Sequence, residues 1–84
     1  MKPVAPIVKL FDGNRMSVQA SAYHYCTPRN DEGPYTHYEV GFPTFVDHDL
    51  LEYAEEPDKP MKTVYAYVPV ELIDKIITKH GGRV

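Results

Sequence analysis

The segment VELIDKIITKHGG, residues 70 to 82, constrains the fold more than any other part of the chain. Its apolar residues recur at the spacing of one helical face, namely Val70, Ile73, Ile76, Ile77 and His80, with Leu72 beside them. Glu71 stands four residues before Lys75, and Gly81-Gly82 follows where a helix C-terminus favours residues that adopt positive φ. Because such a helix must bury its apolar face, the segment predicts an amphipathic C-terminal helix packed on a sheet.

Four stretches have the β-branched composition or the alternation of apolar and polar residues that is typical of strands: 4 to 11, 16 to 25, 35 to 42 and 61 to 68. The tripeptide Asp12-Gly13-Asn14 tolerates the positive φ of a tight hairpin turn. Prolines and a glycine make residues 26 to 34 a loop, and Asp47 is suited to cap a short helix over 47 to 54. We therefore expect an α+β fold, in which an antiparallel meander of about four strands carries the C-terminal helix on one face.

Size and charge restrict the classes of protein that remain. A chain of 84 residues forms one domain, residues 1 to 84, because it cannot supply two hydrophobic cores. The formal net charge of −3 repels phosphate backbones, which makes nucleic acid an unfavourable partner. Cys26 is the single cysteine, and no apolar run approaches the length of about 18 residues that spans a bilayer. We expect a cytoplasmic protein without a membrane segment.

The apolar residues of the second and third strands suggest how these strands pair. Aligning Val18 with Phe42, Ala20 with Val40 and Ala22 with Tyr38 places the apolar sets on one face. The opposite face then carries the pairs Ser21–Glu39, Tyr23–His37 and Tyr25–Tyr35. If the valines of the fourth strand point inward, Tyr65 and Tyr67 join this second face. This register therefore predicts a sheet surface rich in tyrosine and histidine.

A partner is expected to cover this surface, because each exposed aromatic ring forgoes roughly 1.5 to 3 kcal/mol of possible burial. Tyrosine and arginine are also favoured at the centres of protein interfaces. The predicted partner-binding residues are Tyr23, Tyr25, Arg29, Tyr35, His37, Glu39, Tyr65 and Tyr67. In the alternative, residues 44 to 60 fold back over this face and build a second core from Phe45, Leu50, Leu51 and Tyr53. The loop at 26 to 34 then remains the exposed candidate.

Enzymatic and ligand-binding alternatives have fewer supporting residues. His24 and Cys26 are spaced as a thiol and a base would be, but no glycine-framed nucleophile turn accompanies them. A metal site would draw on His24, Cys26, His37 and His48, whose spacing is unlike that of structural zinc sites, or on the acidic run at 47 to 58. A nucleotide could stack on tyrosines beside Arg29 and His37. We assign no catalytic residue, metal or cofactor, and a metal-dependent enzyme is the last of these alternatives.

Two blocks of the chain, YHYCTPRNDEGPYTHYEVGFP and TVYAYVPVELIDKIITKHGG, resemble small proteins encoded by tailed bacteriophages and cover about half of its length. The resemblance brings no functional motif, so it assigns no site residue. It implies a viral protein that binds and modulates or inhibits a host protein, in the cytoplasm of the host cell. The expected partner is thus a host protein, or a second copy of the chain in a homodimer.

Overall fold

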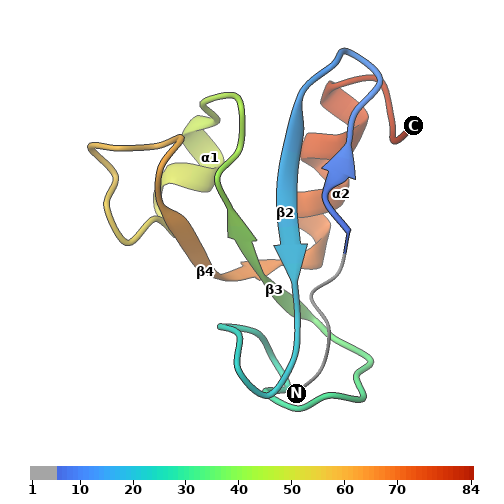
Figure 1. Ribbon diagram of the computed structural model, residues 1–84, viewed down its shortest axis with the longest axis vertical. Helices are drawn as coiled ribbons and strands as arrows, with labels where there is room; N and C mark the ends of the chain where they lie inside the picture. Colours follow the sequence, from blue (N-terminus) through green and yellow to red (C-terminus); the bar gives the residue numbers. More distant parts are fainter. Residues whose placement is uncertain (1–5) are drawn as a thin grey trace.

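The fold is seen in a computed structural model, which describes residues 6 to 84. Its elements follow the order β1 (Val8–Lys9), β2 (Arg15–Gln19), β3 (His37–Gly41), α1 (His48–Leu51), β4 (Val64–Pro69) and α2 (Val70–Lys79). The strands form one antiparallel sheet in the order β1-β2-β3-β4, and α2 lies behind this sheet in Figure 1. The predicted α+β meander with a C-terminal helix is confirmed. Residues 4 and 5 of the predicted first strand lie outside the described residues.

Helix α2 begins directly after β4 and ends at the glycine pair. Pro69 closes the strand and stands at the helix N-cap, and the Val70 N–H donates to the carbonyl of Thr36 at 3.0 Å. At the other end Gly81 has φ 88°, and the N–H groups of Gly81 and Gly82 donate to carbonyls of the last helical turn. Both the predicted helix and its predicted stop are confirmed, since a left-handed glycine satisfies the free carbonyls of a helix end.

The core lies between α2 and the sheet and also receives α1. Its buried apolar residues are Val8, Leu10, Met16, Val40, Leu50, Tyr65, Val68, Ile73 and Ile76. Asp47 caps α1 as predicted, its carboxylate accepting the N–H groups of Asp49 at 2.9 Å and Leu50 at 3.2 Å. The Phe45 ring packs on His80 beyond the end of α2, with 4.4 Å between ring centroids. Residues 45 to 54 therefore extend the single core beside α2 and do not build a second core over the opposite face.

Strands β2 and β3 pair two residues away from the predicted register. Val18 lies opposite Val40 and Gln19 opposite Glu39, whereas the sequence predicted Val18 opposite Phe42. A shift of two residues keeps each side chain on its face, so Val18 and Val40 still share the core side. The predicted pairs Tyr23–His37 and Tyr25–Tyr35 are wrong, because β2 ends at Gln19.

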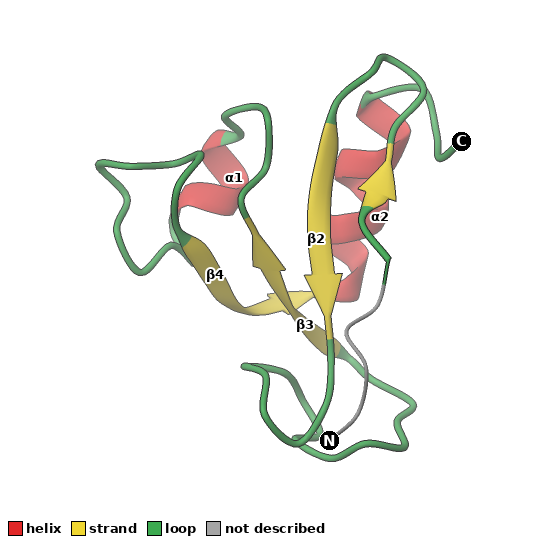
Figure 2. Ribbon diagram, in the orientation of Figure 1, coloured by secondary structure: helices red, strands yellow, loops and turns green. Residues whose placement is uncertain are grey.

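Side-chain hydrogen bonds explain the early end of β2. The Asp31 carboxylate accepts the N–H of Ala22 at 3.0 Å, and the Ser21 hydroxyl accepts the N–H of Tyr23 at 3.0 Å. Serine and aspartate offer the backbone an alternative to the sheet ladder in this way. The chain consequently leaves the sheet and forms the long loop below β2 and β3 in Figure 2.

A β-bulge separates the two halves of β4. Tyr38 pairs with Val68 and Val40 pairs with Tyr65, so Glu39 stands opposite both Ala66 and Tyr67. The extra residue returns Tyr65 to the core face, where it is 1% exposed. The prediction that Tyr65 shares the outer face with Tyr67 is wrong, because strict alternation fails wherever one strand has a residue more than its neighbour.

Both edges of the sheet are covered by the protein's own backbone. Beside β1, Leu10 bridges Arg83, and the Val84 N–H donates to the Lys9 carbonyl at 3.0 Å. Beside β4, Ala54 bridges Tyr65. Few strand groups are thus left open for pairing with another chain. Over residues 6 to 84, no helix has the length and apolar character needed to cross a bilayer.

Candidate protein interface

Half of the predicted interface residues meet on the face of the sheet opposite α2. The rings of Tyr25 and Tyr67 lie with centroids 6.0 Å apart and planes tilted by 47°. Arg29 Cζ lies 5.3 Å from the centroid of the Tyr25 ring, within cation–π range. The Glu39 carboxylate accepts the Tyr25 N–H at 3.3 Å. These four residues are called the Tyr25–Tyr67 cluster below.

Backbone contacts at the bulge hold the cluster together. The Tyr67 N–H donates to the Tyr25 carbonyl at 3.1 Å, while the preceding Ala66 N–H donates to the Tyr53 carbonyl at 3.0 Å. The Ala66 N–H belongs to the bridge between Ala54 and Tyr65 at the edge of β4, whereas the Tyr67 N–H, at the bulge, binds a segment distant in the sequence. As a result, the loop that carries Tyr25 and Arg29 is fixed to β4 at the bulge, where Tyr67 stands.

The other predicted interface residues have different neighbours, although His37, two residues before Glu39 in β3, projects to the same face of the sheet. Tyr23 is 71% exposed on the turn that follows β2. Tyr35 packs edge-on against Tyr38 at 5.6 Å, and its hydroxyl donates to the Asn30 carbonyl at 2.8 Å. The imidazole of His37 shares a 2.8 Å hydrogen bond with the hydroxyl of Thr36.

Tyr65 is a core residue, and its hydroxyl donates to the Pro60 carbonyl. Burial, and to a smaller extent the charge of Asp47, raises the pKa of the Tyr65 phenol. The prediction that Tyr65 contributes to a partner-binding face is therefore wrong.

Two aromatic residues are exposed in a backbone conformation that non-glycine residues rarely adopt. Among residues 6 to 84, the non-glycine residues with positive φ are Phe42 at 49° and Tyr67 at 54°. Phe42 is 59% exposed and Tyr67 is 43% exposed. Each such residue costs about 1 to 2 kcal/mol, and strain of this kind concentrates at functional sites. Phe42 was not among the predicted site residues, because no residue pattern marks a left-handed phenylalanine.

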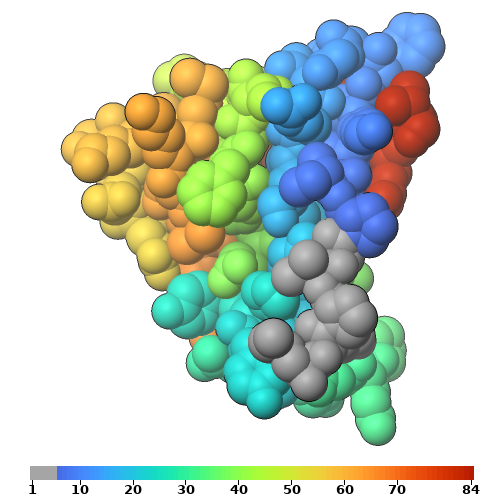
Figure 3. All heavy atoms as spheres, in the orientation of Figure 1, coloured from blue at the N-terminus to red at the C-terminus, as the bar shows by residue number. Residues whose placement is uncertain are grey.

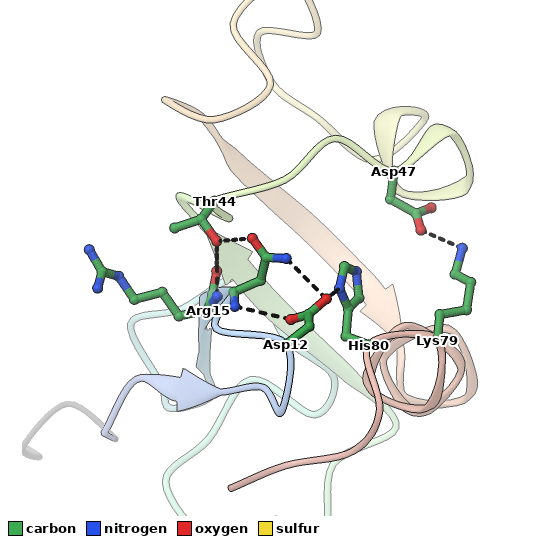
Figure 4. A network of polar contacts seen from close by, with 7 residues as sticks. Asp12, Arg15, Thr44, Asp47, Lys79 and His80 are labelled. Carbon is green, nitrogen blue, oxygen red and sulfur yellow. Dashed lines mark hydrogen bonds and ion pairs between the residues drawn. The ribbon is translucent and has the colours of Figure 1, made fainter.

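A network of polar contacts connects the turn between β1 and β2 with the end of α2 and with Thr44 (Figure 4). Asp12 and His80 are joined by a 2.5 Å contact between Oδ2 and Nδ1. Asn14 donates to the same carboxylate at 3.1 Å, and it accepts the Thr44 hydroxyl at 2.8 Å. The hydrogen bond from His80 and that from the Asn14 N–H lower the pKa of Asp12. This network ties the first hairpin to the end of α2 and to the segment after β3, which is a structural role.

Asp47 joins the two helices, since Lys79 Nζ lies 2.6 Å from its Oδ2. Burial by itself raises the pKa of Asp47, but the Lys79 ammonium and the helix N–H groups outweigh it and hold the pKa below 3.8. Asp49 of the same acidic run also contacts α2, with 3.5 Å between its Oδ2 and Lys75 Nζ. Across the part of the chain described here, no three His, Cys, Asp or Glu side chains gather where they could hold a metal ion.

The side chains of His24 and Cys26 form hydrogen bonds within the turn that follows β2. His24 Nδ1 lies 2.6 Å from the Ser21 hydroxyl, and the buried Cys26 thiol donates to the Ser21 carbonyl at 3.1 Å. A buried thiol used in this way is typical of a packed structural cysteine and offers little access to a substrate.

Comparison with known proteins adds no relative: no family model, curated protein or solved structure matches the chain.

Proposed function

We propose that this chain is a non-enzymatic interaction module that binds a protein through the Tyr25–Tyr67 cluster and the adjoining loop at 26 to 34. The observation that carries the proposal is the exposed ring of Tyr67, which a β-bulge with a left-handed residue directs outward beside Tyr25. Tyrosine and arginine are the residue types that most often dominate binding energy at interfaces. A strained aromatic residue on the surface has no comparable use in packing the core.

The partner binds by side-chain docking on the sheet face. Strand addition is disfavoured because backbone of the same chain already covers both sheet edges. A stable interface buries about 800 Å² on each partner, more than the cluster alone provides. Tyr23, Asp31 and Glu32 are exposed and would supply further contact area. Within this surface the tyrosine rings form the apolar centre, and Arg29 and Glu39 provide polar specificity.

The resemblance to phage-encoded proteins favours a host protein as the partner, whose activity the chain would modulate or inhibit. A second copy of the chain is the other candidate occupant. The nucleotide alternative has less support, because the imidazole of His37 is hydrogen-bonded to Thr36 and the guanidinium of Arg29 lies over the Tyr25 ring.

Affinity capture from bacterial lysate tests the proposal with three proteins side by side: the wild-type chain, Tyr67→Asn and Val46→Thr. Asparagine accepts the left-handed conformation and removes the ring. Val46 is half-exposed and lies near α1, outside the cluster, so its variant is the matched control. The wild type and Val46→Thr should retain a common partner, with binding to Tyr67→Asn weakened by about 2 kcal/mol.

Sedimentation of the purified proteins tests the homodimer. If the wild-type chain is a dimer, Tyr67→Asn should dissociate it. A nucleotide-dependent rise in melting temperature that Arg29→Gln abolishes would favour the ligand-binding alternative. If Tyr67→Asn keeps every interaction of the wild type, the cluster is not the interface.

A further inference from the structure

A hollow of about 250 Å³ lies on the surface at the end of the sheet where β2 begins and β3 ends. Ile7 and Phe42, both about half-exposed, form its walls, and Met16 and Gly41 lie beneath. It is called the Ile7–Phe42 hollow here. In Figure 3 the blue first hairpin and the yellow-green segment after β3, which contribute these residues, lie side by side on the visible face.

Gly41 and Phe42 create the space. A Cβ at Gly41 would make ordinary contacts of 3.7 Å with Ser17 and Val64, so the position tolerates a side chain but has none. The next residue, Phe42, is left-handed at φ 49°, and its ring stands exposed at the edge of the hollow. The second strained aromatic residue of the molecule thus borders a cavity outside the Tyr25–Tyr67 cluster.

The charge at the hollow has a single sign. Arg15 is its charged lining residue, and within residues 6 to 84 no carboxylate lies within ion-pair distance of the guanidinium. The Arg15 backbone is fixed, because its N–H donates to the Thr44 hydroxyl at 2.9 Å and its carbonyl accepts the Thr44 N–H at 3.0 Å. Figure 4 shows the guanidinium extended away from the contact between Asp12 and His80.

We infer that the Ile7–Phe42 hollow binds a small apolar carboxylate. The apolar part would lie between Ile7 and Phe42, and the carboxylate would accept paired hydrogen bonds from Arg15. A ring of six carbons fits, since benzene occupies an engineered apolar cavity of about 150 Å³ in another protein. A second hollow, of about 290 Å³, carries both Asp74 and Arg83 and so has no net preference for an anion.

Amide NMR of the full chain tests this site with 3-phenylpropionate as the probe. Binding near the millimolar range is expected, with shifts confined to the amides around Arg15 to Ser17 and Gly41 to Thr44. The uncharged 3-phenylpropanol should bind about tenfold more weakly than the acid. Arg15→Gln should weaken the binding of 3-phenylpropionate to the same degree. Arg83→Gln, which removes a guanidinium outside the hollow, should leave binding unchanged.

Gly41→Val provides a steric test, because its side chain would fill the hollow from below. It should abolish the shifts, and a urea unfolding curve establishes that the variant is folded. Equal affinity for the acid and the alcohol, an unchanged affinity in Arg15→Gln, or shifts that map to the second hollow around Ile77 would overturn the inference. The site uses no residue of the Tyr25–Tyr67 cluster, so failure here leaves the proposed protein interface intact, and Tyr67→Asn should bind the probe normally.

Discussion

Tyr65 and Val68 are three residues apart in β4, yet both are buried on the face that packs against the helices. In a regular strand, residues three apart point to opposite faces. The bulge opposite Glu39 resolves this conflict by adding a residue, and Tyr67 takes a left-handed conformation to do so. One backbone irregularity therefore seals one tyrosine in the core and directs another toward solvent.

Replacing Tyr67 with asparagine should change the free energy of unfolding by less than about 0.5 kcal/mol. The relieved backbone strain, about 1 to 2 kcal/mol, offsets the lost ring contact with Tyr25, about 0.5 to 1.5 kcal/mol. Urea unfolding measures the difference. Tyr67→Val is the matched control, because a β-branched residue keeps the strain and loses the ring; it should be clearly less stable than Tyr67→Asn. Equal losses in both variants would show that the ring supports the fold.

Tyr65→Ala should destabilise the protein by about 3 to 5 kcal/mol, because it opens a cavity in the core. Tyr65→Phe keeps the ring and leaves the Pro60 carbonyl without its donor, so it should cost about 1 to 1.5 kcal/mol. Thermal and urea unfolding check both values. A stable Tyr65→Ala variant with impaired partner binding would contradict the placement of Tyr65 in the core.

Tyr23→Ala should leave the free energy of unfolding within about 0.5 kcal/mol of wild type, because the side chain is largely in solvent. Partner binding should weaken by up to about 2 kcal/mol if Tyr23 belongs to the interface. Titration calorimetry with the captured partner measures the second effect. Unchanged affinity would place Tyr23 outside the contact area.

Acid should weaken the contact between α1 and α2. The pKa of Asp47 is lowered below 3.8 in the folded protein, so its stabilisation is present above the unfolded value and is lost as pH falls through the folded value. Asp47→Asn keeps a capping oxygen and removes the ion pair with Lys79; at neutral pH it should cost about 1 kcal/mol. Unfolding curves from pH 7 to 2 should show that Asp47→Asn loses less stability in acid than the wild type does. Lys79→Gln should also lose less than the wild type. Parallel pH profiles for wild type and variants would refute the linkage.

The contact between Asp12 and His80 predicts an NMR titration. The Asp12 carboxyl should titrate below its ordinary value of 3.8. In His80→Gln the pKa of Asp12 should move up toward that value, because the principal hydrogen bond that favours the carboxylate is removed. Asn14→Ala, which keeps the backbone donor to Asp12, should cause a smaller change. A wild-type titration at 3.8 or above would contradict the contact.

Local patterns were sufficient for the helices and for the fold class, whereas the order of the strands comes from the structure. The apolar spacing and the glycine pair defined α2, and Asp47 marked the start of α1, because helix caps and helical periodicity involve neighbouring residues. The fold class followed from these elements, since a single apolar helix face needs a sheet to cover. The faces of β2 and β3 were also correct, although the register differed by two residues.

The sequence by itself thus determined an α+β meander with a C-terminal helix, and it pointed to tyrosine and arginine as candidate contact residues. Only the tertiary structure decided which tyrosines remain exposed. Strand register and the bulge depend on hydrogen bonds between distant segments, such as those from Ala66 to Tyr53 and from Tyr67 to Tyr25. One additional residue in a strand reverses the faces beyond it, and no periodicity in the strand's own sequence records that reversal.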